Sequence, residues 1–188
     1  MKHTHMNFSK TMKGTIRIFA LMILAFAGMS CMKSKLEVTY NKQESQIDKY
    51  LSSKTDMRIE RNGGANRLVT VEGEGEALSG NGFVSFYYAG YTFSGSFSAA
   101  NMFVTNHQAS AEQAGWDLTD ADYAIHETNM ADAKLIQGLK DGLIGVRAGE
   151  ECEILFSGKF GFGNESFGII PANSALLYKI WVVGVTND

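Results

Sequence analysis

One strongly amphipathic segment, Asp132–Ile144, most constrains what this chain can fold into. Asp132 is the expected N-cap of a helix there, and Gly145 is the expected C-terminal stop. The apolar side chains recur at helical spacing, which predicts a helix with one apolar face that packs on something larger. These side chains are Leu135, Ile136, Leu139, Leu143 and Ile144.

Strand-like segments lie on both sides of this helix. They are rich in β-branched and aromatic residues, and the last is almost continuously apolar, as a buried central strand should be. Because the strands do not alternate with helices, the sequence predicts an α+β fold, an antiparallel sheet covered on one side by one main helix. Asn62–Gly64 is an expected turn. The expected strands are Arg67–Val71, Phe83–Phe93, Cys152–Ser157 and Ala175–Val185.

The N-terminus has the pattern of an export signal. Four basic residues and no acidic residue accompany an apolar run, Ile18–Ala27, and small residues follow up to Cys31. The run is short for a membrane span but suits a signal peptide, which we expect over residues 1–30. Cys31 stands where a bacterial lipoprotein carries its lipidated cysteine, although Gly28 occupies a position where Leu is usual. The alternative is a plain secretory signal with a chance cysteine.

Acylation of Cys31 would anchor the protein to a bacterial membrane in the cell envelope, and we expect it to face the periplasm. Removal of residues 1–30 leaves 13 basic against 20 acidic residues, a formal charge of −7. We therefore expect no binding of nucleic acid. Residues 31–66 are predicted to form a tether with a short helix, because Ile47, Tyr50 and Leu51 are spaced three and four apart. The sequence leaves open whether that helix docks on the domain, self-associates or forms a stalk.

The motifs after the tether occur in a recognisable order and spacing. Gly73–Gly75 and Tyr87–Gly90 come first, and the Gly-rich segment Leu135–Glu150 covers the expected helix and the turn after it. Three further motifs follow, Phe160–Gly163, Gly168–Pro171 and Ser174–Tyr178. Together they resemble FKBP-type peptidyl-prolyl cis-trans isomerases, and the resemblance spans residues 67–188, which we expect to form the isomerase domain.

The resemblance implies an FKBP-like half-barrel sheet wrapped around the main helix, with an apolar pocket between them that holds a substrate proline. The alternative for each pocket residue that the resemblance implies is that it is an ordinary residue of the hydrophobic core. Carried over position by position, the catalytic residues would be Tyr88, Phe103, Phe162, Ile170 and Tyr178. The other substrate-binding residues would be Tyr123, Leu135, Ile136, Leu139 and Ile169.

Isomerisation needs little besides such a pocket. The barrier to rotation about the X-Pro bond is ~18–20 kcal/mol, because resonance gives that bond double-bond character. The twisted transition state loses this resonance and is less polar, so an apolar pocket favours it. We therefore expect no cofactor and no metal, and the expected partners are proline-containing polypeptides. The two histidines after residue 30, His107 and His126, make no metal-ligand pattern with Cys152.

Three residues depart from the family pattern. Val104 falls where an acidic residue is usual, Phe162 where a Tyr hydroxyl is usual, and Leu139 where many members have Trp. The stretch after Phe103 is also long and includes a possible extra helix, Gln108–Ala114. Two main functions remain open: an isomerase that assists the folding of exported proteins, and a binding or chaperone module with weak or no isomerase activity. A structural subunit of an envelope complex is a third.

Overall fold

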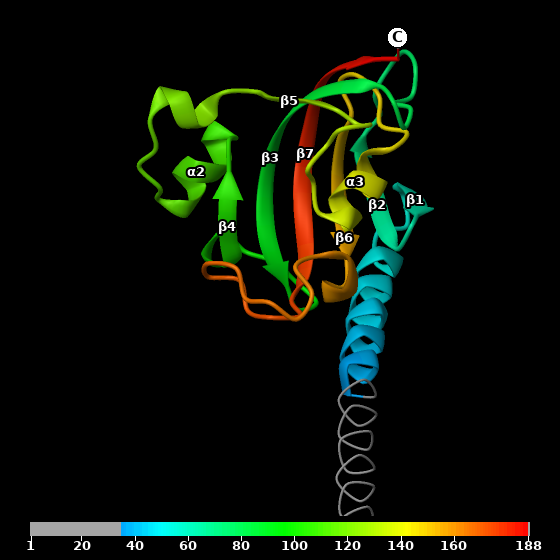
Figure 1. The fold of residues 1–188 in the computed structure, drawn as a ribbon, viewed down its shortest axis with the longest axis vertical. Coiled ribbons are helices and arrows are strands. Elements are labelled where there is room, and N and C mark those ends of the chain that lie inside the picture. Colours follow the sequence, from blue (N-terminus) through cyan, green and yellow to red (C-terminus); the bar gives the residue numbers. More distant parts are fainter. Residues whose placement is uncertain (1–34, 188) are drawn as a thin grey trace, which may run out of the picture. The chain divides into compact units, whose positions relative to one another are not determined.

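The computed structural model describes residues 35–187, which form one antiparallel sheet with helices on both of its faces (Figure 1). The expected signal peptide and Cys31 lie outside the described residues. Six strands follow the order β1-β2-β6-β7-β3-β4, and the seventh, β5, pairs with the first part of β3. The strands are β1 (Arg58–Asn62), β2 (Ala65–Val71), β3 (Phe83–Phe93), β4 (Met102–Thr105), β5 (His126–Asn129), β6 (Glu151–Phe156) and β7 (Ala175–Thr186).

The four predicted strands are confirmed to within two residues at each end, as β2, β3, β6 and β7. The longest two, β3 and β7, pair along their whole length, from Phe83 with Thr186 to Phe93 with Ala175. The predicted turn is also confirmed, because Gly63 and Gly64 join β1 to β2 with φ values of 57° and 94°. Two-residue hairpins favour such positive φ values. The sheet thus begins at Arg58, earlier than residue 67.

The main helix is shorter than predicted. It is α3 (Gln137–Leu143), and Asp132 is not its N-cap, since the extended residue Ile136 holds that position. Leu135 and Ile136 fit the helical spacing, but they precede the helix and pack beside the sheet instead. Apolar spacing alone cannot distinguish an extended segment that precedes a helix from the first turn of that helix. Gly145, with φ 87°, follows the helix as expected.

Two glycines bring α3 close to β6. A Cβ added at Gly138 would lie 2.2 Å from the Phe156 ring, and one added at Gly142 would lie 2.2 Å from Ile154 Cγ2. Residues four apart share one face of a helix, so both glycines meet the same strand. The neighbouring helix residues Leu139 and Leu143 are buried in the core. This contact fixes α3 against the sheet at short range.

A buried ion pair holds the end of α3. Arg67 of β2 donates from Nη1 to the carbonyl oxygens of Gly142 and Ile144, at 2.9 and 2.6 Å. Its Nε lies 3.2 Å from Oε1 of Glu150, and both side chains are buried. Burial raises the pKa of Glu150, and the nearby Arg67 opposes that shift. Removal of Glu150 would leave the Arg67 charge buried without this partner, and removal of Arg67 would leave Glu150 with only the more distant Arg58, at 3.9 Å.

A helix over residues 35–52, here called the N-terminal helix, covers the other face of the sheet from Tyr40 onward. Ile47 and Leu51 are fully buried there, and they belong to a cluster that includes Leu68 and Leu177. The Tyr50 hydroxyl donates to Oε2 of Glu153 at 2.6 Å. The predicted helix is therefore present, and of the three possibilities for it the structure shows docking. The sheet is covered on both faces rather than on one.

The stretch between β4 and β5 contains the extra helix, α2 (Gln108–Ala114), at the bounds predicted for it. Three short 3-10 turns complete the fold: η1 (Ala99–Asn101), η2 (Asp120–Tyr123) and η3 (Gly158–Phe160). Among residues 35–187, no helix combines the length and apolar character that crossing a membrane requires.

Candidate functional site

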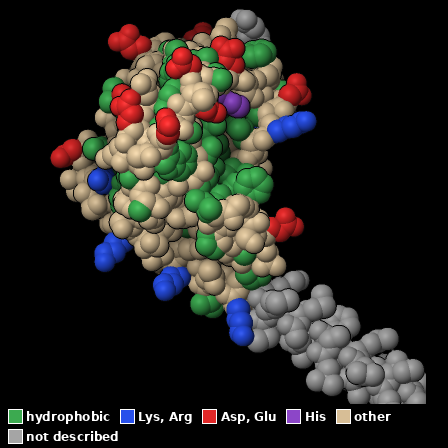
Figure 2. Space-filling model, turned by 90° about the vertical axis from the view of Figure 1, so that its left-hand side faces the viewer, with side chains coloured by type: hydrophobic (Ala, Val, Ile, Leu, Met, Phe, Trp, Pro, Cys, Tyr) green, Lys and Arg blue, Asp and Glu red, His purple; other side chains and the backbone are tan. Residues whose placement is uncertain are grey.

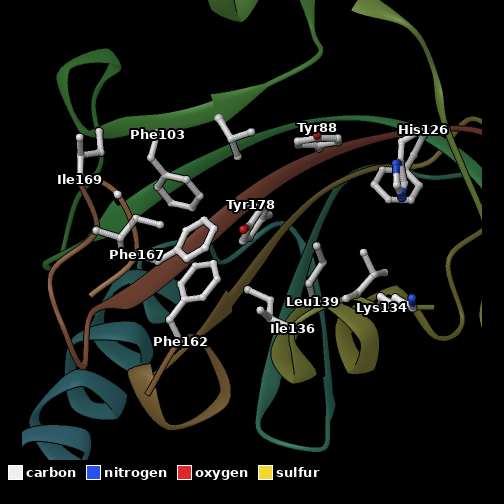
Figure 3. Close-up of a pocket in the computed structure, with 15 residues that line it drawn as sticks. Tyr88, Phe103, His126, Lys134, Ile136, Leu139, Phe162, Phe167, Ile169 and Tyr178 are labelled. Carbon is white, nitrogen blue, oxygen red and sulfur yellow. The ribbon is translucent and has the colours of Figure 1, made fainter. Parts of the chain in front are cut away.

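An apolar cavity of about 550 Å³ lies between the sheet, the start of α3 and the loop that joins η3 to β7. Hydrophobic side chains gather in the middle of the face that Figure 2 shows, with acidic side chains above them. The lining comes from six parts of the chain: strands β3, β4, β5 and β7, α3 with the segment that leads into it, and the loop between η3 and β7. It consists of Phe86, Tyr88, Phe103, Val104, His126, Lys134, Leu135, Ile136, Leu139, Phe162, Phe167, Gly168, Ile169, Ile170 and Tyr178 (Figure 3).

The structure brings every predicted pocket residue to this cavity except Tyr123. Tyr123 lies on η2 and lines a separate hollow with Tyr87 and His107. Tyr87 and Tyr88 are adjacent on β3, so their side chains point to opposite faces of the sheet. Tyr123 thus does not line this cavity, and its assignment as a substrate-binding residue stays a prediction.

The floor of the cavity is built around Tyr178 of β7. Its ring meets the Phe103 ring edge to face, with centroids 5.7 Å apart and planes at 84°. Gly90 of β3 pairs with Tyr178 in the sheet. A Cβ added at Gly90 would lie 2.8 Å from Phe103 and 2.9 Å from Tyr178, so the absence of a side chain there lets the two rings meet.

Two hydroxyl groups interrupt this apolar surface. The Tyr178 hydroxyl points into the cavity and Tyr88 lies beside it (Figure 3). Burial raises the pKa of Tyr178, and the neighbouring Tyr88 adds to that shift. Burial raises the pKa of Tyr88 as well. Both phenols therefore stay protonated at neutral pH and can donate a hydrogen bond to a ligand.

The opposite wall is a loop with exposed apolar side chains. The rings of Phe162 and Phe167 stack with centroids 4.9 Å apart. Phe167 and Ile170 exchange two backbone hydrogen bonds of 3.0 and 2.9 Å, which close a tight turn. This turn buries Ile170 but leaves Ile169 73% exposed and Phe167 64% exposed at the mouth of the cavity. The wall thus continues onto the surface.

Sequence reasoning missed several lining residues. Phe86 precedes Tyr88 by two positions on β3, and the period of a strand could have placed both on the pocket face. His126 pairs with Phe86 across the sheet, and its ring packs against Phe86 at 5.1 Å and Tyr88 at 6.0 Å. No pattern in the sequence predicted β5, the strand that carries His126. Lys134 and Phe167 were missed because they lie outside regular elements.

The contacts that this arrangement offers to a ligand are mainly apolar. The described part of the chain holds no group of three or more His, Cys, Asp or Glu side chains placed to bind a metal ion. The cavity offers aromatic and aliphatic walls for a compact apolar ring, with phenol donors at its floor. Val104 lines the cavity at the position where an acidic residue was expected, so this part of the wall is apolar too.

Known proteins with similar sequences fall in one family. FK506-binding protein 1A of Neurospora crassa is 33% identical over 57 residues, which cover 30% of this chain and 48% of that protein. The chain therefore matches about half of the length of that relative. FK506-binding protein 1 of Aspergillus oryzae is 22% identical over 117 residues, 62% of this chain and 94% of that protein.

Solved structures with the same fold include the three FKBP domains of wheat FKBP73, with a TM-score of 0.55 and 19% identity. That match covers 70% of this chain and 52% of the wheat chain. FkpA from Escherichia coli matches with a TM-score of 0.53 and 17% identity over 96% of this chain and 74% of FkpA. At such identities these likenesses concern the fold, and the predicted FKBP-like fold with an N-terminal helix is confirmed. Residues 75–183 match the model of the FKBP-type peptidyl-prolyl cis-trans isomerase family, and the chain therefore belongs to that family.

Proposed function

We propose that this protein is a peptidyl-prolyl cis-trans isomerase that binds the proline of an extended chain in the apolar cavity. The observation that carries the proposal is the lining itself, in which Tyr178 and Phe103 form a floor and Leu139 and Ile170 form walls. A proline ring is compact and apolar, so it fits a cavity of this kind. Its substrates would be proline-containing segments of other proteins.

The cavity would act on the amide bond before the proline. In the twisted transition state the amide loses resonance and polarity, so an apolar wall stabilises that state relative to the planar amide. Phe162 has no hydroxyl for the substrate carbonyl, but the Tyr178 hydroxyl points into the same cavity (Figure 3). We therefore assign the donor role to Tyr178, with Tyr88 beside it. One such hydrogen bond contributes about 0.5–1.5 kcal/mol.

A protease-coupled isomerisation assay of the full chain, with peptides that vary the residue before proline, tests this proposal. We expect a rate above the uncatalysed one, and a large loss of that rate in Tyr178→Ala and Ile170→Ala. Val183→Ala is the matched control, because its side chain lies on β7 and is exposed, outside the cavity. A wild-type rate equal to the uncatalysed one contradicts the enzyme assignment.

The second candidate is a binding or chaperone module that holds a proline-containing or unfolded chain without catalysis. The apolar residues Val104 and Phe162 in the lining favour it, since both replace polar groups that are usual in the family. This candidate predicts tight binding of an unfolded chain, lost in the same two variants, and no acceleration of isomerisation.

The site of action would be the cell envelope of a bacterium. The basic start, apolar run and Cys31 support a lipid anchor on the processed chain, which would assist the folding of exported proteins. Cys31→Ala should move the protein from the membrane fraction to the soluble fraction. Retention of this variant in membranes, or an unprocessed N-terminus in mass spectrometry, contradicts the anchor.

A further inference from the structure

One side chain of the N-terminal helix contacts both ends of the loop that forms the outer wall of the pocket. Gln43 donates from Nε2 to the carbonyl oxygen of Asn173 at 2.6 Å, and its Oε1 accepts from the backbone N–H of Gly158 at 2.9 Å. The Tyr40 hydroxyl donates to Oδ1 of Asn173 at 2.6 Å. The loop between Gly158 and Asn173 is therefore held at its two ends by the helix on the opposite face of the sheet.

The two ends of this loop meet closely. A Cβ added at Gly158 would lie 2.4 Å from the carbonyl oxygen of Asn173. Gly163 bridges them, because its N–H donates to Gly158 at 3.1 Å and its carbonyl accepts from the N–H of Asn173 at 2.6 Å. Asn173 has a φ of 59°, in the left-handed region that Asn tolerates better than most residues. The Gln43 amide completes this junction with one donor and one acceptor.

The loop that this junction closes carries much of the pocket wall, including Phe162, Phe167, Ile169 and Ile170. Its tip has little packing of its own, as Phe167 and Ile169 are mostly exposed. The position of the wall relative to the Tyr178 floor therefore depends on how the ends of the loop are fixed. Exposed segments with few buried contacts open locally at low free energy.

We infer that Gln43 and Tyr40 are positioning residues for the pocket, so that docking of the N-terminal helix sets how well the loop wall receives a substrate. This inference rests on the proposed binding of proline segments in the cavity. The helix also packs on the sheet independently of Gln43, through the buried side chains of Ile47 and Leu51, which follow Gln43 in the sequence. Loss of the Gln43 contacts should thus loosen the loop without detaching the helix.

The test compares Gln43→Met with Gln46→Met in the full chain. Both remove a carboxamide from the same helix, but Gln46 donates to Ser94 at the end of β3 and does not touch the loop. Hydrogen–deuterium exchange should become about two- to tenfold faster at Gly163, Ile170 and Asn173 in Gln43→Met alone, which is the effect of losing hydrogen bonds of ordinary strength. Exchange in residues 44–51 reports whether the helix stays docked. Tyr40→Phe should give a smaller change of the same kind.

The second readout is the isomerisation of a peptide with a Leu-Pro bond. Gln43→Met should raise KM by about two- to tenfold and change kcat less, because the floor at Tyr178 is untouched. Equal loop exchange in Gln43→Met and Gln46→Met overturns the inference, as does faster loop exchange with an unchanged KM. If the wild type shows no isomerisation and no peptide binding, the proposed function fails, while loop exchange still decides whether Gln43 fixes the loop.

Discussion

Leu177 and Tyr178 are neighbours on β7, and their side chains point to opposite faces of the sheet. Leu177 is fully buried in the cluster that the N-terminal helix covers, whereas Tyr178 forms the floor of an open cavity. One face is closed by packing and the other is left unfilled between α3, the sheet and the loop wall. The difference shows that a single strand supplies stability on one side and a binding surface on the other.

The largest expected effect comes from the buried ion pair that supports α3 at the pocket face. Arg67→Met should lower the free energy of unfolding by roughly 3–5 kcal/mol, because it leaves the buried Glu150 with only the more distant Arg58, at 3.9 Å. Chemical denaturation measures this loss. Arg61→Met is the control, since this arginine is 57% exposed and forms its ion pair with the exposed Asp48. Equal losses in the two variants contradict the structural role of the pair.

Leu177→Ala tests the closed face of β7. We expect a loss of about 2–5 kcal/mol in the free energy of unfolding, because the substitution leaves a cavity in packed surroundings. The isomerisation rate should stay nearly unchanged at a temperature where the variant is folded, since the side chain points away from the pocket. A rate that falls as far as in Tyr178→Ala would remove the functional distinction between the two faces.

Leu143→Ala makes the matching change beneath the pocket face. Leu143 is fully buried between α3 and the sheet, and its loss should also cost about 2–5 kcal/mol. Unlike Leu177→Ala, it should weaken peptide binding as well, because α3 carries Leu139 into the lining. A stability loss below about 0.5 kcal/mol, the size typical of surface positions, would contradict the packing of α3 described above.

The smallest expected effects concern the hydroxyl groups of the open face. Tyr178→Phe keeps the ring and removes the donor, so kcat/KM should fall by up to about tenfold, the value of one modest hydrogen bond. Phe162→Tyr adds a hydroxyl to the same cavity and should raise kcat/KM by up to about tenfold. The two changes together should largely compensate. No change in either single variant would mean that neither position contacts the substrate carbonyl.

Much of the fold could be predicted because long strands and the Gly-rich helix region have strong local patterns. The strand Phe83–Phe93 was predicted at its observed bounds, and the extra helix Gln108–Ala114 was as well. Short strands such as β5 could not be found, because four residues give too little pattern. The start of α3 was misplaced because Leu135 and Ile136 keep helical spacing while extended.

The pocket was largely predicted through the family resemblance rather than from periodicity. Two lining positions were not predicted correctly: Tyr123 lies on η2 and lines a separate hollow, and His126 lines the cavity from β5, a strand that the sequence did not predict. The contacts of Gln43 with Gly158 and Asn173 join residues more than a hundred positions apart. Only the folded chain brings such polar groups together.

Chemical-shift mapping with a proline-containing peptide tests the central claim most directly. The two faces of the sheet can be followed separately in the full chain, through the side-chain signals of Tyr88, Leu139 and Tyr178 on one face and those of Leu68 and Leu177 on the other. We predict saturable shifts centred on the cavity lining, and their loss in Tyr178→Ala. Shifts that centre on the helix-covered face, or that persist unchanged in Tyr178→Ala, would contradict the assignment of the cavity as the proline-binding site.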